Sequence, residues 1–184
     1  MLKIETKLVK VISGGQCGVD QGALAAAREV GLLTGGTAPR GYRTTHGPCH
    51  LLRHFGLEEH DSPDYPPRTE ENVKNSDATL IIACDLSSAG EVLTMNLCRR
   101  HDKPFHVIEV VPQETERQFY AYLDSQVATA AEAFFSEVRP RILNVAGNRD
   151  QGDSPAMYLV TQYVIVRLVQ ELSNLDLVLR DTDL

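Results

Sequence analysis

Strand-like and helix-like segments alternate along this chain. Apolar runs rich in β-branched residues recur at 8–12, 78–84, 105–111 and 142–145. Between and after them, apolar residues at helical spacing predict helices over 19–30, 90–101, 126–137 and 154–173. Parallel strands need crossover connections, so this alternation is typical of βαβ units. We therefore predict an α/β fold with a mainly parallel sheet and helices on both faces.

Length and composition indicate one globular domain. At 184 residues the chain is long enough to bury a real core, and we predict a single domain over 1–175 followed by a short, fraying tail at 176–184. The net charge of −7 argues against nucleic acid and anionic membranes as partners. No apolar run is long enough to span a membrane.

The N-terminus and the cysteines suggest a cytoplasmic location. Residues 1–11 alternate into the first strand and lack the apolar core of a signal peptide. The four cysteines have no paired spacing and two sit in apolar runs, which suits a reducing compartment: Cys17, Cys49, Cys84 and Cys98.

The segment 35–67 interrupts the alternation. It is rich in glycine and proline, so we expect it to be mostly loop. A loop this long in a compact domain tends to be functional. We expect it near the carboxyl ends of the strands, where open α/β sheets bind ligands.

A glycine-rich turn lies between the first strand and the first helix, from Ser13 to Gly18. It has serine where a dinucleotide-binding loop starts with glycine, and no acidic residue follows about 20 residues later. Gly18 is not followed by Lys-Ser/Thr, so neither an NAD site nor a Walker-type ATP site is predicted. A turn that exposes backbone N–H groups at the start of a helix can still bind an anion in general. The alternative is a tight turn without a ligand, but Gln16 and Asp20 at its lip favour binding.

Candidate cations come from outside this turn. They are Arg40, Arg43, Arg68 and Arg149, which follow apolar runs or lie in the long loop. Arginine matches phosphate oxygens with two parallel hydrogen bonds, although each of these residues could equally be solvated surface. Thr69 before Glu70, Glu71 and Asn72 is typical of a helix start, which explains part of this polar cluster by capping alone.

Two more specific kinds of site, a metal site and a cysteine nucleophile, are disfavoured. His46, Cys49, His50 and His54 lie too close together for a four-ligand zinc site, and no further ligand pair completes them. Cys17, near a helix N-terminus, has no histidine close in sequence to act as its base. We therefore predict neither a metal site nor a cysteine nucleophile.

Four segments carry a family resemblance: SGGQCGVDQGAL, TGGTAPRGYRT, RTEENVKNSDATLII and LNVAGNRD. In this order they resemble the putative molybdenum carrier family, over about residues 8–170. That family belongs to a superfamily of Rossmann-like folds with the lonely-guy phosphoribohydrolases and the DNA-processing protein. The resemblance implies a Rossmann-like three-layer sandwich that binds a phosphate-bearing ligand, which in named members is molybdenum cofactor.

The resemblance also implies site residues. Matching positions are Gly14, Gly15, Gln16, Gly18, Asp20, Pro39, Arg40, Gly41, Arg68, Glu70, Asn72, Asn144, Gly147 and Arg149. This chain differs from the family at Cys17, where threonine is usual, and at 88–91, where Ser-Ala-Gly-Glu replaces Thr-Gly-Gly-Thr. We retain Cys17, Gly90 and Glu91 as candidate ligand-binding residues.

The leading hypothesis is a carrier or sensor for molybdenum cofactor or a nucleotide. The glycine loop would hold the phosphate, with Arg40, Arg43 or Arg149 adding charge, and Glu70, Asn72 and Asn144 would contact the ring edge. Superfamily members often dimerise, so we expect a homo-oligomer. The alternative is a nucleotide N-glycosidase in which Glu91 acts on the ribose with Asp20 or Glu70, unless Glu91 only caps a helix. A DNA-binding role is disfavoured by the net charge.

Overall fold

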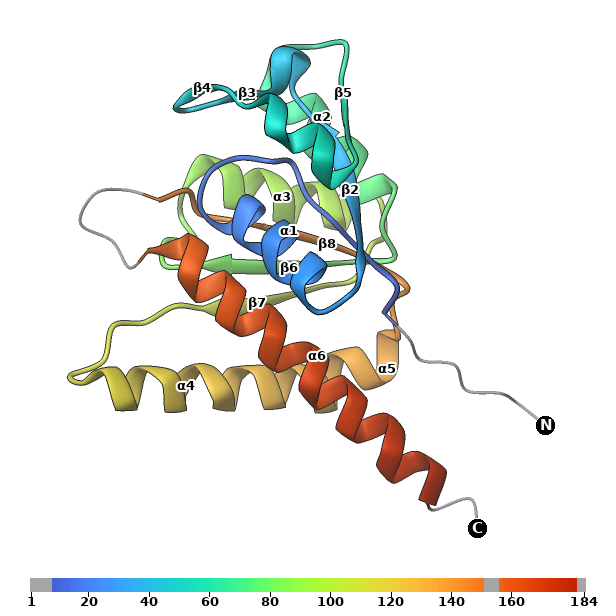
Figure 1. The fold of residues 1–184 in the computed structure, drawn as a ribbon, viewed down its shortest axis with the longest axis vertical. Coiled ribbons are helices and arrows are strands. Elements are labelled where there is room, and N and C mark those ends of the chain that lie inside the picture. Colours follow the sequence, from blue (N-terminus) through green and yellow to red (C-terminus); the bar gives the residue numbers. More distant parts are fainter. Residues whose placement is uncertain (1–7, 151–155, 182–184) are drawn as a thin grey trace.

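The protein is built around one parallel sheet. The computed structural model describes residues 8–150 and 156–181. Within these residues, six parallel strands are ordered β5-β2-β1-β8-β6-β7 (Figure 1). Their bounds are β1 Lys10–Ile12, β2 Leu33–Ala38, β5 Leu57–Glu59, β6 Ala78–Ala83, β7 Phe105–Glu109 and β8 Ile142–Gly147.

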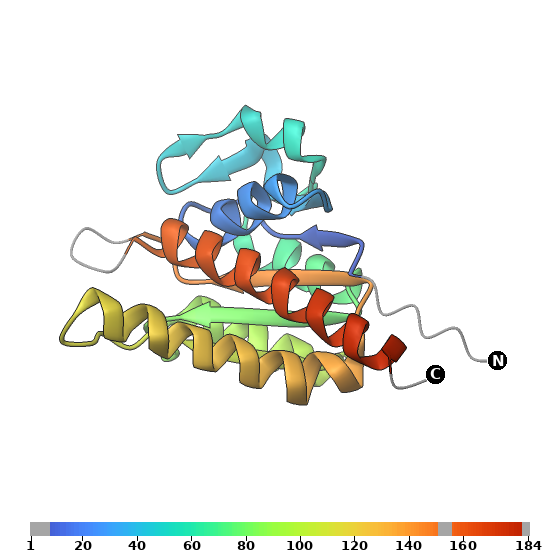
Figure 2. The ribbon, with the colours of Figure 1, turned by 60° about the horizontal axis from the view of Figure 1, so that its bottom comes forward.

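Helices cover both faces of the sheet, which gives three layers (Figure 2). One face packs α1 (Val19–Glu29), α4 (Glu116–Thr129) and α6 (Met157–Asp181) over the main apolar core. The other face carries α2 (Tyr65–Lys74) and α3 (Ala89–Arg100), which bury Val73 against Leu97 and Cys98. The predicted α/β, Rossmann-like class is confirmed.

Residues 40–56 form a small lobe beside β2 and β5, at the top of Figure 1. It contains η1 (Arg40–Tyr42), a short antiparallel pair of β3 (Arg43–Thr44) with β4 (Gly47–Pro48), and η2 (His50–Phe55). Tyr42, Leu52 and Leu57 bury a second apolar cluster against Leu24 of α1. This packing places the lobe next to the glycine loop.

The predicted strands at 8–12, 78–84, 105–111 and 142–145 all form, as do the helices that begin near residues 19 and 90. The prediction that 35–67 is mostly loop was wrong at its start, because residues 35–38 belong to β2. Glycine is disfavoured in strands, but a Cβ at Gly36 would lie 2.2 Å from the Ser13 carbonyl oxygen. The close approach of β2 to the end of β1 therefore requires glycine.

Three helix boundaries also differ from the predictions. Helix α2 begins at Tyr65 with prolines in its first turn, so Thr69 lies inside the helix, where its hydroxyl donates to the Tyr65 carbonyl at 3.0 Å. Helix α4 begins at Glu116 rather than 126, because the Thr115 hydroxyl caps it by accepting from the Gln118 N–H at 3.2 Å. It continues as a π-helix (η3, Ala130–Phe135) and α5 (Ser136–Val138).

Helix α6 runs to Asp181, past the predicted end at 173 and into the segment expected to fray. Residues 154–155 of that predicted helix lie outside the described residues, as do the start of the predicted domain at 1–7 and the end of the tail at 182–184. None of the helices that the structure describes is long and apolar enough to cross a membrane.

Candidate functional site

A pocket of about 430 Å³ opens at the carboxyl edge of the sheet. It lies where the segments after β1, β6 and β8 meet the first half of α2, and its wall includes the N-terminal turn of α3. This is the edge at which open α/β sheets bind ligands, and the volume suits a small molecule. Of the predicted site residues, the pocket brings together Gln16, Asp20, Arg68, Gly90, Glu91, Gly147 and Arg149.

The glycine loop is partly filled by its own side chains. The Gln16 N–H donates to the Asp20 carboxylate at 3.1 Å, and the Cys17 N–H donates to the Gln16 side-chain oxygen at 3.0 Å. These two N–H groups were expected to be free for a phosphate. Because Asp20 occupies that position, a second anion there would meet a carboxylate at close range.

The glycines of this loop make room for neighbouring groups. A Cβ on Gly14 would lie 1.6 Å from a terminal nitrogen of Arg68, so only glycine leaves space for that guanidinium. Gly15 and Gly18 have φ values of 78° and 86°, in the region that favours glycine. Gly14, Gly15, Cys17 and Gly18 themselves lie outside the pocket lining.

Arg68 is a largely buried cation with unused hydrogen-bonding capacity. Its side chain is 12% exposed and lies over the Tyr65 ring, 5.7 Å from the centroid. One terminal nitrogen is 3.5 Å from the Asp20 carboxylate, which is a long contact, and Nε has no partner among the described residues. An unpaired buried donor costs about 1–3 kcal/mol, so an arginine held in this state needs an explanation.

Asp20 and Glu91 are buried carboxyl groups in the same pocket. Asp20 is 3% exposed, and burial raises its pKa above the usual range although Arg68 opposes the shift. Glu91 is 5% exposed, accepts a hydrogen bond from the Ser88 hydroxyl, and has its pKa raised to about 7 by burial, with smaller contributions from Asp20 and Asp85. A carboxyl group that titrates near neutral pH can act as an acid or a base.

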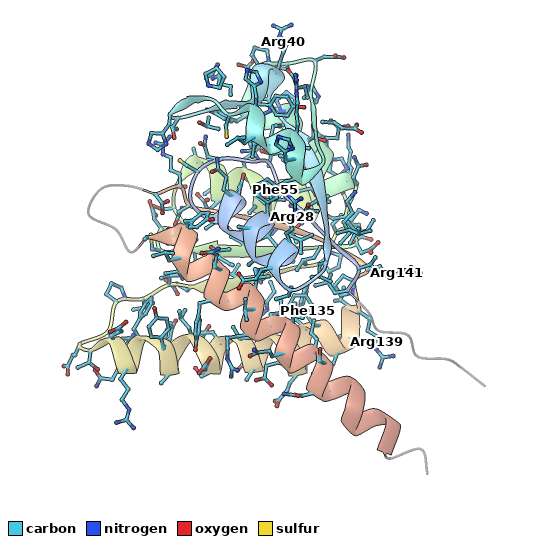
Figure 3. The ribbon with its side chains drawn as sticks, in the orientation of Figure 1. Arg28, Arg40, Phe55, Phe135, Arg139 and Arg141 are labelled. Atoms are coloured by element: carbon cyan, nitrogen blue, oxygen red, sulfur yellow. The ribbon has the colours of Figure 1, made fainter. Side chains whose placement is uncertain are left out.

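The remaining predicted arginines do not converge as expected. Arg149 lies in the pocket wall, whereas Arg40 lies at the far tip of the lobe (Figure 3). Arg43 is exposed and its guanidinium lies over the Tyr65 ring, 5.2 Å from the centroid. Pro39, which precedes the lobe, and Gly41, within it, also lie outside the pocket lining. The Gly41 N–H donates to the Glu59 carboxylate at 2.6 Å.

Three polar residues predicted to contact a ring instead hold the fold together. The Asn72 amide accepts from the Thr37 N–H at 2.8 Å and donates to the Thr37 carbonyl at 3.0 Å, which fixes α2 to β2. Asn144 is buried in β8 and donates to the Thr79 hydroxyl at 3.2 Å. Glu70 pairs with His101 at 2.7 Å, and none of the three lines the pocket.

Sequence reasoning missed Asn148, which joins two loops of the site. Its side-chain oxygen accepts from the Cys84 and Asp85 N–H groups, each at 2.8 Å, and its nitrogen donates to the Asp85 carbonyl at 3.1 Å. The segments after β6 and β8 are thereby held together. The available signal was a polar residue shortly after the strand predicted at 142–145, within the segment LNVAGNRD. Tyr65, Ser88 and Thr94, also in the pocket wall, were missed as well.

The side chains of His46, Cys49, His50 and His54 in the lobe do not form a group that could bind a metal ion. Across residues 8–150 and 156–181, no group of three or more histidine, cysteine, aspartate or glutamate side chains could hold an ion. All four cysteines have free thiols. The Cys17 sulfur lies 3.0 Å from the Thr45 hydroxyl.

A parallel sheet between helical layers, with a pocket at its carboxyl edge, defines a Rossmann-like α/β protein. The model of the Circularly permutated YpsA SLOG family matches residues 11–169. The chain therefore belongs to this family, which confirms the family resemblance seen in the sequence. No curated protein matches the chain.

A solved structure is also similar over almost the whole fold. It is the crystal structure of a putative molybdenum carrier protein from Syntrophus aciditrophicus, with 29% sequence identity and a TM-score of 0.74. The similarity covers 88% of this chain and 95% of that chain. The two proteins therefore share their architecture rather than an isolated motif.

Proposed function

We propose that this protein binds a phosphate-bearing, ring-containing small molecule in the pocket, either molybdenum cofactor or a nucleotide. The observation that carries the proposal is Arg68, a largely buried guanidinium in the pocket wall. Among the described residues its Nε has no hydrogen-bond partner, and its one ion pair is the long contact to Asp20. Arginine in such a position suits an anionic group of a ligand. The name of the similar Syntrophus protein supports molybdenum cofactor as the first ligand to test.

The phosphate fits best near the N-terminus of α3. Ser88 and Gly90 at this turn line the pocket, and the first N–H groups of a helix lack partners within the helix. Arg149 lies in the same wall. The glycine loop is less suitable than the sequence suggested, because the Asp20 carboxylate already accepts the Gln16 N–H.

Native mass spectrometry of the purified protein, combined with metal analysis, tests the proposal directly. We expect a retained pterin, with or without molybdenum, or a retained nucleotide. A protein that carries no small molecule and does not bind guanosine monophosphate in a calorimetric titration would contradict the proposal.

Removal of one pocket arginine is expected to weaken binding. Arg149→Ala should reduce the affinity for guanosine monophosphate by about 1.5–3 kcal/mol, the range for a hydrogen bond to a charged group. Arg40→Ala is the matched control, since Arg40 is exposed in the lobe and lies outside the pocket lining. Calorimetry on both variants provides the measurement, and equal affinities would show that Arg149 does not contact the ligand.

A second candidate function is nucleotide N-glycosidase activity, and the pKa of Glu91 near 7 favours it. A carboxylate in this position could stabilise the positive charge that develops on the ribose when the bond to the base breaks. Asp20, in the same pocket, could assist.

Base release distinguishes the two functions. If the protein is an N-glycosidase, incubation with adenosine or guanosine monophosphate should liberate the free base, and Glu91→Gln should abolish the reaction while retaining binding. We expect no release from either protein, because the glycine-threonine-glutamate pattern of the phosphoribohydrolases is incomplete at 88–91. Chromatographic detection of a base whose release depends on Glu91 would replace the binding hypothesis with the enzymatic one.

A further inference from the structure

The side-chain amide of Gln16 is fixed at the pocket wall by hydrogen bonds to its oxygen. Oε1 accepts from the N–H of Cys17 at 3.0 Å, from the N–H of Thr45 at 3.0 Å and from the Thr45 hydroxyl at 3.2 Å. Thr45 lies in the turn between β3 and β4. The amide therefore joins the glycine loop to the lobe.

These contacts determine which end of the amide remains for a ligand. Two of the three partners are backbone N–H groups, which can only donate, so the amide atom that they contact must be the oxygen. Every hydrogen bond of the Gln16 side chain within residues 8–150 and 156–181 is made by Oε1 and none by Nε2, and Gln16 lines the pocket. Gln16 thus offers the pocket a group that donates and cannot accept.

The neighbouring charge restricts what Nε2 can contact. The buried Asp20 carboxyl group accepts the Gln16 N–H at 3.1 Å and lies 3.5 Å from Arg68, so a phosphate beside Gln16 would compete with Asp20 for both donors. A neutral ring carbonyl would not be repelled. An amino group on the ring would place its N–H donors against the N–H donors of Gln16 Nε2, so no hydrogen bond could form between them.

We propose that Gln16 is a specificity-determining residue that donates from Nε2 to a ring carbonyl of the ligand. The pocket then selects rings with an oxo group over rings with an amino group at the same position. Pterins and 6-oxopurines carry such a carbonyl, whereas adenine carries an amine. This inference rests on the proposed binding function and specifies which face of the ligand the glycine loop contacts.

Inosine and adenosine monophosphates provide the test, because they share the ribose and phosphate and differ only at position 6 of the ring, oxo or amino, and in the hydrogen on the adjacent N1. Calorimetry on the wild-type protein should show tighter binding of the inosine nucleotide by about tenfold, the equivalent of one hydrogen bond. Gln16→Glu keeps an oxygen for Cys17 and Thr45 but presents an acceptor to the pocket. It should abolish or reverse the preference.

The ratio of the two affinities separates specificity from general repulsion, since added negative charge weakens both nucleotides alike. Gln113→Glu adds the same charge at an exposed position outside the pocket and should leave the ratio unchanged. Equal affinities in the wild type, or the same ratio in Gln16→Glu, would overturn this inference and leave the proposed function standing. A wild-type protein that binds neither nucleotide would overturn the proposal for purine ligands together with this inference.

A second variant keeps the inference testable if Gln16→Glu does not fold. Thr45→Val retains the N–H that fixes Oε1 and removes the hydroxyl contact at an exposed residue. The inosine-to-adenosine ratio should fall by about two- to threefold, as expected for one weak hydrogen bond. An unchanged ratio would show that the lobe does not hold the Gln16 amide in place.

Discussion

Gly147→Ala is expected to destabilise the protein by about 3 kcal/mol or more, near the upper end of the range for overpacking a core. A Cβ at this position would lie 1.9 Å from the Ile82 carbonyl oxygen and 2.9 Å from a methyl group of Val19. The Ile82 oxygen belongs to the backbone of a central strand, so no side-chain rotation relieves the overlap. Parallel pairing of β6 and β8 at their ends therefore depends on glycine.

Thermal unfolding measures this effect. For a domain of this size, a loss of 3 kcal/mol corresponds to a decrease in melting temperature of roughly 6–12 °C. Gly90→Ala is the matched control, because a Cβ at Gly90 in α3 has no neighbour within 4 Å and alanine favours helix. That control should be neutral or slightly stabilising. A Gly147→Ala protein as stable as the wild type would mean that the two strands can separate at little cost.

Glu91→Gln is expected to become more stable than the wild type as the pH rises from 5 to 8. The native pKa of Glu91 is raised to about 7 from an ordinary value of 4.5, so the folded protein holds this proton more tightly than the unfolded chain. Raising the pH through this window removes the proton and lowers the free energy of unfolding of the wild type. Glutamine is neutral at every pH, so the difference should reach about 1–3 kcal/mol in favour of the variant at pH 8.

Denaturant unfolding at pH 5 and pH 8 provides the comparison. Glu70→Gln serves as the control: Glu70 lies outside the pocket, and hydrogen bonds from His101 and Lys74 lower its pKa, so its charged form stabilises the fold. That variant should be no more stable than the wild type at either pH. A Glu91→Gln effect that is the same at pH 5 and pH 8 would show that burial does not hold this carboxyl group neutral.

The sequence indicated Glu91 less clearly than the structure does. Its position three residues after Ser88 at a helix start is typical of a cap, and the Ser88 hydroxyl does contact its carboxylate. Burial and the proximity of Asp20 change the chemistry of the same residue, because they raise its pKa. Asp20 belongs to α1 and Glu91 to α3, so local spacing in the sequence could not reveal the pKa shift.

The sequence by itself determined the layers of the fold and the edge at which the pocket lies. Alternating β-branched runs and helical patterns specify parallel strands with crossover helices, because each pattern records which face of one element is buried. The glycine loop after β1 and the residues after β8 could be assigned to the carboxyl edge on the same basis.

Only the tertiary structure decided which polar residues face the pocket. Asn72 and Asn144 pair with Thr37 and Thr79, residues distant in sequence, whereas Arg68 remains under-paired in the pocket wall. A sequence lists donors and acceptors but does not state which are satisfied, since each hydrogen bond depends on a partner that the fold brings close. The same reason explains why Asp20 fills the glycine loop and why Gln16, held by Thr45, offers only a donor to the pocket.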